Sequence, residues 1–91
     1  MKLILDGNSI KDKESLHKHM EESLAFPEWY GGNLDALYDC LTELMEEVDV
    51  ELLNWDAMKE HLGEYADRVR RVLNDAAQAN LNILIIEKTK E

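Results

Sequence analysis

The sequence is poor in the residues that cross-link a chain or interrupt it. Of its 91 residues one is cysteine, Cys40, and one is proline, Pro27. A single cysteine excludes an internal disulfide and favours a reducing compartment. Apolar runs are short, and Ile83–Ile86 is a typical one. Such runs exclude a membrane-spanning helix, and the three apolar residues after Lys2 are too few for a signal-peptide core. We therefore expect a cytoplasmic protein.

Positive charge is also scarce. Ten lysines and arginines face twenty aspartates and glutamates, which gives a formal net charge of −10. Such a chain repels nucleic acids and anionic membranes and attracts basic proteins. Enzymes that act on nucleic acids are basic because their substrate is anionic, so they are natural partners. Charge alone leaves open that the acidic residues only keep the chain soluble.

The pattern of apolar residues predicts alternating strands and helices in one domain over residues 1–91. The hydrophobic content of 45% is sufficient for one modest core. Asp12 and Asn33 are good N-caps for the first two helices. The predicted strands are 3–5, about 49–53 and 83–86, and the predicted helices are 12–24, 33 to 45 or 46, 55–63 and about 65 to 78 or 79.

Strands separated by helices indicate an α/β fold, with a small three-stranded parallel sheet packed against about four helices. Because Ile83–Ile86 is continuously apolar, we predict that it is buried on both faces as the central strand. The charged residues from Glu87 to Glu91 are expected to fray.

The helix that follows Asn33 has two contrasting faces. Leucines at helical spacing form the core face: Leu34, Leu37, Leu41 and Leu44. Polar and aromatic residues form the opposite, solvent-facing stripe: Asp35, Tyr38, Asp39 and Thr42.

The two aspartates of this stripe repel one another. The helix dipole favours Asp35 in the first turn, but it gives Asp39, one turn later, no such support. An uncompensated repulsion beside an exposed aromatic ring suggests a surface shaped for a partner, which Trp29 and Tyr30 would extend. Carboxylates and rings in such a patch can imitate the phosphates and stacked bases of RNA.

These residues have other interpretations. Trp29, Tyr30 and Tyr38 could be ordinary half-buried aromatics beside a solvated acidic face. Asp35 and Asp39 lack the nucleophile and oxyanion donor of an acid–base site, and they are too few to enclose Ca²⁺ or Mg²⁺.

The histidines and the cysteine also give no sign of a metal site or of catalysis. His17, His19 and His61 form no metal-ligand spacing with Cys40. We expect His17 at the edge of the core, His19 exposed, and Cys40 as a small packed residue. We therefore expect no enzyme activity, no metal and no cofactor.

The run from Pro27 to Thr42, PEWYGGNLDALYDCLT, closely resembles the barstar family of intracellular ribonuclease inhibitors. The resemblance extends over nearly the whole chain and implies a three-stranded parallel sheet packed against helices. It implies that the helix after Asn33 and the preceding loop plug a ribonuclease active site. The expected partner-binding residues are Trp29, Tyr30, Gly31, Asn33, Leu34, Asp35, Tyr38, Asp39, Thr42 and Asp75.

The partner expected from this resemblance is a basic, secreted microbial ribonuclease in a one-to-one complex, with the free inhibitor a monomer. We expect the protein to bind neither nucleic acid nor membrane. The alternative is a binding module of the same fold whose basic partner is another protein.

Overall fold

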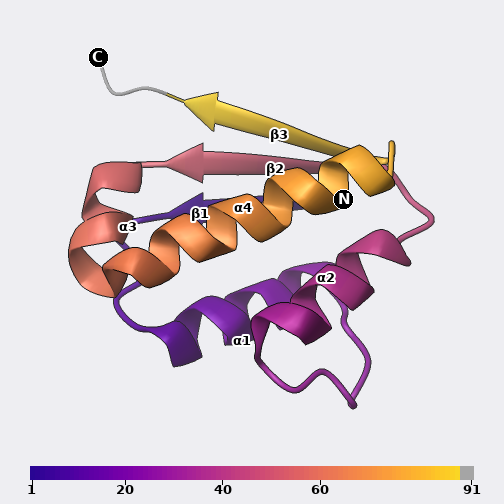
Figure 1. The fold of residues 1–91 in the computed structure, drawn as a ribbon, viewed down its shortest axis with the longest axis horizontal. Coiled ribbons are helices and arrows are strands. Elements are labelled where there is room, and N and C mark those ends of the chain that lie inside the picture. The colour runs from indigo at the N-terminus through magenta and orange to yellow at the C-terminus, as the bar shows by residue number, and fades with distance from the viewer. Residues whose placement is uncertain (89–91) are drawn as a thin grey trace.

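The computed structural model describes residues 1–88 and confirms the predicted α/β architecture (Figure 1). Three parallel strands alternate with four helices. The strands are β1 (Lys2–Asp6), β2 (Val48–Leu53) and β3 (Ile83–Lys88), and the helices are α1 (Lys13–Leu24), α2 (Leu34–Thr42), α3 (Trp55–Leu62) and α4 (Glu64–Ala79).

The strand order corrects one prediction, because β2 and not β3 is the central strand. Burial alternates along β1, since one face of the sheet packs on the helices and the other is open, whereas the central strand β2 is also buried on the open face at Glu51. Ile83 is 5% exposed, whereas its neighbour Leu84 is 57% exposed. The prediction that Ile83–Ile86 is buried on both faces is therefore wrong, and β3 is an edge strand.

The two acidic residues of β2, Asp49 and Glu51, lie on the open face of the sheet. Glu51 lies at the centre of that face, with its carboxylate 3.1 Å from Nζ of Lys88 and 3.2 Å from Nζ of Lys2. Hydrogen bonds from Lys88 and Lys2 lower the pKa of Glu51. One carboxylate on the middle strand thus links both edge strands.

The helix starts follow the predicted caps. The Asp12 carboxylate accepts a hydrogen bond from the Ser15 amide at 2.7 Å, and the Ser15 hydroxyl completes a capping box. The Asn33 side chain accepts from the Ala36 amide at 2.8 Å.

Helix α2 ends earlier than predicted, at Thr42 instead of Met45 or Glu46. The side-chain amide of Asn80, just beyond α4, donates to the carbonyls of Leu41 at 3.0 Å and Leu44 at 2.9 Å. A tertiary donor thus takes up carbonyl groups that further helical turns would have used.

The chain remains ordered into its charged end. Glu87 and Lys88, which were expected to fray, belong to β3, and Arg70 of α4 forms an ion pair with Glu87. The rest of the predicted frayed tail, 89–91, lies outside the described residues. No helix in residues 1–88 is both long enough and apolar enough to cross a membrane.

Candidate partner-binding surface

The solvent-facing side of α2 carries the residues that the sequence placed there. Asp35, Tyr38, Asp39 and Thr42, here called the acidic stripe, are exposed or half-buried. The opposite side of the helix is fully buried at Leu37 and Leu41 and packs against α4. Leu44, predicted on the same core face, is half-buried but lies past the helix end.

The two aspartates of the acidic stripe carry exposed negative charges. Within residues 1–88 no lysine or arginine forms an ion pair with Asp35 or Asp39. The sequence contains no lysine or arginine between Lys18 and Lys59, a stretch that holds the whole loop and α2. The negative charge of this surface is therefore uncompensated locally.

Glu43 is a candidate that the sequence reasoning missed. It caps the C-terminal end of α2, is exposed, and continues the four-residue spacing of Asp35 and Asp39. The last turn of α2 holds no basic residue, although the helix dipole favours cations there. The four-residue spacing of acids was the signal in the sequence that would have identified it.

The Thr42 hydroxyl is engaged within the helix. Its Oγ1 donates to the Tyr38 carbonyl oxygen at 2.9 Å and to the Asp39 carbonyl oxygen at 3.1 Å. Its hydrogen is thereby used, so Thr42 can offer a partner only acceptor lone pairs.

The loop from Pro27 to Asn33 presents one of its two aromatic residues to solvent. The Trp29 side chain is 57% exposed, whereas Tyr30 is 8% exposed. The prediction that Tyr30 extends the exposed aromatic surface is therefore wrong. Its ring packs against Phe26, with centroids 4.8 Å apart, so it anchors the loop from within.

The remaining loop residues have distinct environments. Gly31 and Gly32 are exposed, and Gly32 has a φ of 68°, in the left-handed region that favours glycine. Asn33 is exposed, but its side-chain oxygen is occupied by the cap, and the half-buried Leu34 packs on the core.

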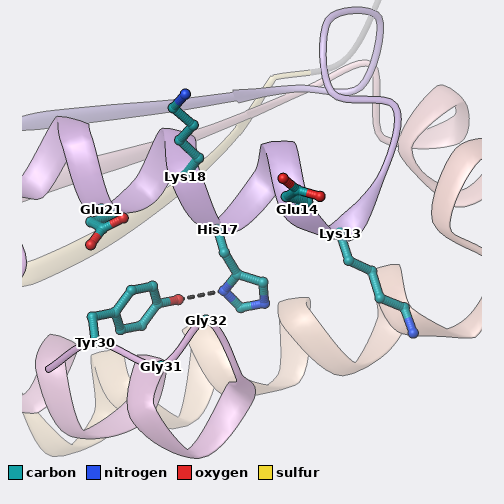
Figure 2. A pocket seen from close by; sticks show the side chains of 8 residues that line it. All are labelled: Lys13, Glu14, His17, Lys18, Glu21, Tyr30, Gly31 and Gly32. Atoms are coloured by element: carbon teal, nitrogen blue, oxygen red, sulfur yellow. Dashed lines mark hydrogen bonds between the residues drawn. The ribbon is translucent and has the colours of Figure 1, made fainter.

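Beside the loop, His17 of α1 joins two tyrosines, of which Figure 2 draws Tyr30. Its Nδ1 is hydrogen-bonded to the Tyr30 hydroxyl, and its Nε2 lies 2.6 Å from the Tyr65 hydroxyl of α4. We call this arrangement the Tyr30–His17–Tyr65 chain. His17 was expected at the core edge and is 6% exposed, and burial lowers its pKa. The imidazole is accordingly neutral at pH 7.

A shallow hollow of about 520 Å³ opens beside this chain, between α1 and the glycines of the loop. Figure 2 shows the Tyr30 hydroxyl directed at the imidazole, with charged α1 side chains around the rim. These rim residues are Lys13, Glu14, Lys18 and Glu21. Opposite charges thus alternate around the entrance, and the hollow has no strong preference for an anion or a cation.

Asp75 is exposed on α4, five residues before Asn80. Because Asn80 bonds to the C-terminal end of α2, the C-terminal half of α4 adjoins that end of the helix. Asp75 thus lies on the helix that packs against α2, and its part in binding a partner stays a prediction.

His19 and Cys40 are held by contacts within the fold. His19 was expected to be exposed, but it is half-buried, and its Nε2 lies 2.7 Å from the Ile4 carbonyl of edge strand β1. Cys40 is 4% exposed, and burial raises the pKa of its thiol. Among residues 1–88 no cluster of three or more potential ligands could hold a metal ion.

Comparison with known proteins identifies the family. The model of the family described as Barstar (barnase inhibitor) matches residues 1–86. The chain belongs to the barstar family. This barstar-family protein is also 40% identical over 78 residues to a Bacillus subtilis (strain 168) protein named "Putative ribonuclease inhibitor YrdF". The match covers 85% of this chain and 86% of that relative, so the resemblance noted in the loop and α2 extends through the fold.

Proposed function

We propose that this barstar-family protein inhibits a basic, secreted ribonuclease by covering its active site with the acidic stripe and the loop from Pro27 to Asn33. Family membership and the name of its Bacillus relative support a ribonuclease inhibitor rather than an enzyme. The observation that carries the finer proposal is the pair of unpaired carboxylates, Asp35 and Asp39, flanked by the exposed rings of Trp29 and Tyr38.

The chemistry of the partner follows from the charge of this surface. An enzyme that binds RNA must present cations where the phosphates lie, and those cations complement carboxylates one helical turn apart. Since no lysine or arginine of residues 1–88 forms an ion pair with Asp35 or Asp39, the two carboxylates can pair with an enzyme's arginines or lysines. Close charge pairs of this kind gave coupling energies of about 1.5–7 kcal/mol in the related barnase–barstar complex.

The exposed rings supply the apolar part of the proposed interface. Trp29 and Tyr38 carry large, rigid side chains of the kind that anchor protein interfaces. They lie on one continuous segment, the loop and α2, which favours a single enzyme molecule per inhibitor. We therefore propose a one-to-one complex formed from a monomeric inhibitor.

The test is a titration of several barnase-like ribonucleases with the purified protein, in which RNA hydrolysis is followed. We expect stoichiometric inhibition of at least one enzyme, and strong loss of inhibition in Asp39→Asn. Asp49→Asn is the matched control, since Asp49 is an exposed aspartate on β2, away from α2. If no enzyme is inhibited at micromolar concentration, the ribonuclease proposal is wrong and a different basic protein becomes the candidate partner.

A further inference from the structure

We propose that His17 is a positioning residue for partner binding: its neutral imidazole, bridging Tyr30 and Tyr65, holds the loop in its binding conformation, and its protonation releases the loop. This inference rests on the proposed function, because it concerns the same binding surface.

The Tyr30–His17–Tyr65 chain connects three separate parts of the fold. His17 comes from α1, Tyr30 from the loop and Tyr65 from α4. Within residues 1–88, the bond from Tyr30 to His17 is the one side-chain hydrogen bond that joins the loop to α1. The other bonds of Tyr30 and Asn33 stay within the loop or cap α2.

The loop backbone also lies directly on this histidine. A β-carbon added to Gly32 would lie 3.9 Å from Cβ of His17. Trp29 precedes Tyr30, and Asn33 starts α2, so a shift of Tyr30 and Gly32 moves both parts of the proposed binding surface. The position of the imidazole is thereby linked to the position of Trp29 and of the first turn of α2.

Protonation of His17 conflicts with this arrangement. A neutral imidazole has one N–H and one lone pair, so one tyrosine accepts from it and the other donates to it. The imidazolium donates from both nitrogens, so the donating tyrosine must turn its hydrogen away. Burial raises the pKa of both Tyr30 and Tyr65, so neither supplies a phenolate to balance the cation.

The surrounding charges do not remove the conflict. On α1, Glu14 and Glu21 at the rim of the hollow favour a cation, whereas Lys13 and Lys18 oppose it. The Lys13 ammonium lies over the Tyr65 ring, 4.5 Å from its centre. Two further groups act on the tyrosines: Arg68 of α4 lies near Tyr65, and the neutral Cys40 thiol of α2 lies near Tyr30. With two acids and two lysines around it, the imidazolium gains no net counter-charge on α1.

The sign of the expected pH dependence follows from linkage. When the loop is open and His17 is solvated, its pKa returns toward about 6.5. The closed loop keeps the pKa lower, so the open state takes up a proton first as the pH falls below about 6.5. A partner that binds the closed loop must expel that proton. Affinity should therefore fall by up to about tenfold per pH unit between about 6.5 and the lowered pKa of His17.

The first experiment compares inhibition constants of the unaltered protein, His17→Gln and His19→Gln against one ribonuclease between pH 5 and 8. At each pH, titration of the enzyme's own groups cancels in the ratio of the inhibition constants of two variants. We expect affinity of the unaltered protein and of His19→Gln to fall at low pH relative to His17→Gln. His19 is the matched control because it is a half-buried histidine on the same helix, outside the Tyr30–His17–Tyr65 chain.

The second experiment uses the free protein and needs no ribonuclease. Tyr30 is 8% exposed and its amide donates to the Pro27 carbonyl at 3.0 Å, so hydrogen exchange of this amide requires the loop to open and reports that opening. We expect protection of this amide, corrected for intrinsic exchange, to fall below pH 6.5. We expect Tyr65→Phe to lower it at every pH, since that variant keeps the ring but removes the hydroxyl. Tyr65→Phe also serves as the test should His17→Gln fail to fold.

The outcomes separate the two proposals. Inhibition with identical pH profiles for the unaltered protein and His17→Gln would overturn the role of His17 and leave the proposed function standing. Absence of inhibition by any variant would refute the proposed function, while amide exchange would still decide whether His17 holds the loop. Unchanged protection in Tyr65→Phe and at low pH would refute the inference in the free protein.

Discussion

Asp39→Asn should weaken ribonuclease binding strongly and yet leave the free inhibitor as stable or slightly more stable. The substitution keeps the shape of the side chain and removes its charge. Asp39 is exposed, pairs with no cation in residues 1–88, and lies one turn from Asp35 on one side and Glu43 on the other. It also lies in the C-terminal half of α2, where the helix dipole disfavours an anion.

The size of the stability change follows from these neighbours. Each like-charge pair one turn apart costs roughly 0.2–0.5 kcal/mol in an isolated helix. Solvent and salt screen these exposed charges, so a gain of about 0.5 kcal/mol at low salt is the expected order for both pairs together. For a domain of this size that corresponds to about 2–4 °C in the melting temperature. Asp35→Asn should gain less or lose stability, because the first turn favours its charge.

The effect on binding should be much larger. Removal of the carboxylate leaves an enzyme cation buried without a partner, which costs about 2–5 kcal/mol or more. A larger value is known for the corresponding aspartate of barstar. Urea melts of the free proteins, measured beside inhibition constants for Asp35→Asn, Asp39→Asn and the control Asp49→Asn, test both halves. A clear loss of stability in free Asp39→Asn would show that Asp39 is a structural residue. It would refute the idea that the charge repulsion within the acidic stripe lowers the free energy of unfolding.

Four further outcomes are expected. The association rate with a basic ribonuclease should fall steeply as salt rises, and a rate independent of salt in stopped-flow mixing would contradict electrostatic steering. Cys40→Ala should retain inhibition and lose about 1 kcal/mol in urea melts, and loss of inhibition by a folded variant would contradict its packing role. Gly7→Ala should lose about 3 kcal/mol or more through overpacking, because its β-carbon would lie 2.2 Å from the Asn54 carbonyl oxygen and 2.4 Å from the Met58 nitrogen. An unchanged melt would exclude that close approach. Finally, stability should decrease as the pH falls below about 6.5, because the unfolded chain binds a proton at His17 before the folded chain does. In His17→Gln this part of the pH dependence should vanish, and its persistence there would assign it to other groups.

The sequence by itself determined the elements and the composition of the candidate surface. Strands and helices follow from local periodicity, and the caps at Asp12 and Asn33 use side chains only three residues from their amide partners. The two faces of α2 also follow from helical spacing alone, since neighbours along a helix lie three and four residues apart. The resemblance of the run from Pro27 to Thr42 to the barstar family also rests on residues that are contiguous in the sequence.

Only the tertiary structure decided which residues meet across the chain. The apolar run Ile83–Ile86 predicted a strand correctly. The order of the strands depends on pairing between residues far apart in the sequence, and β3 pairs only with β2, so it lies at the edge of the sheet. Trp29 and Tyr30 are adjacent aromatic residues, yet only Tyr30 turns inward, where its hydroxyl bonds to His17 and its ring packs on Phe26. Asn80 bonds to carbonyls at the end of α2 that lie 39 and 36 residues earlier in the sequence. The hydrogen bond between Tyr65 and His17 joins residues that are 48 positions apart. Such contacts leave no periodic trace in the sequence, because their geometry is set by how the helices pack on the sheet.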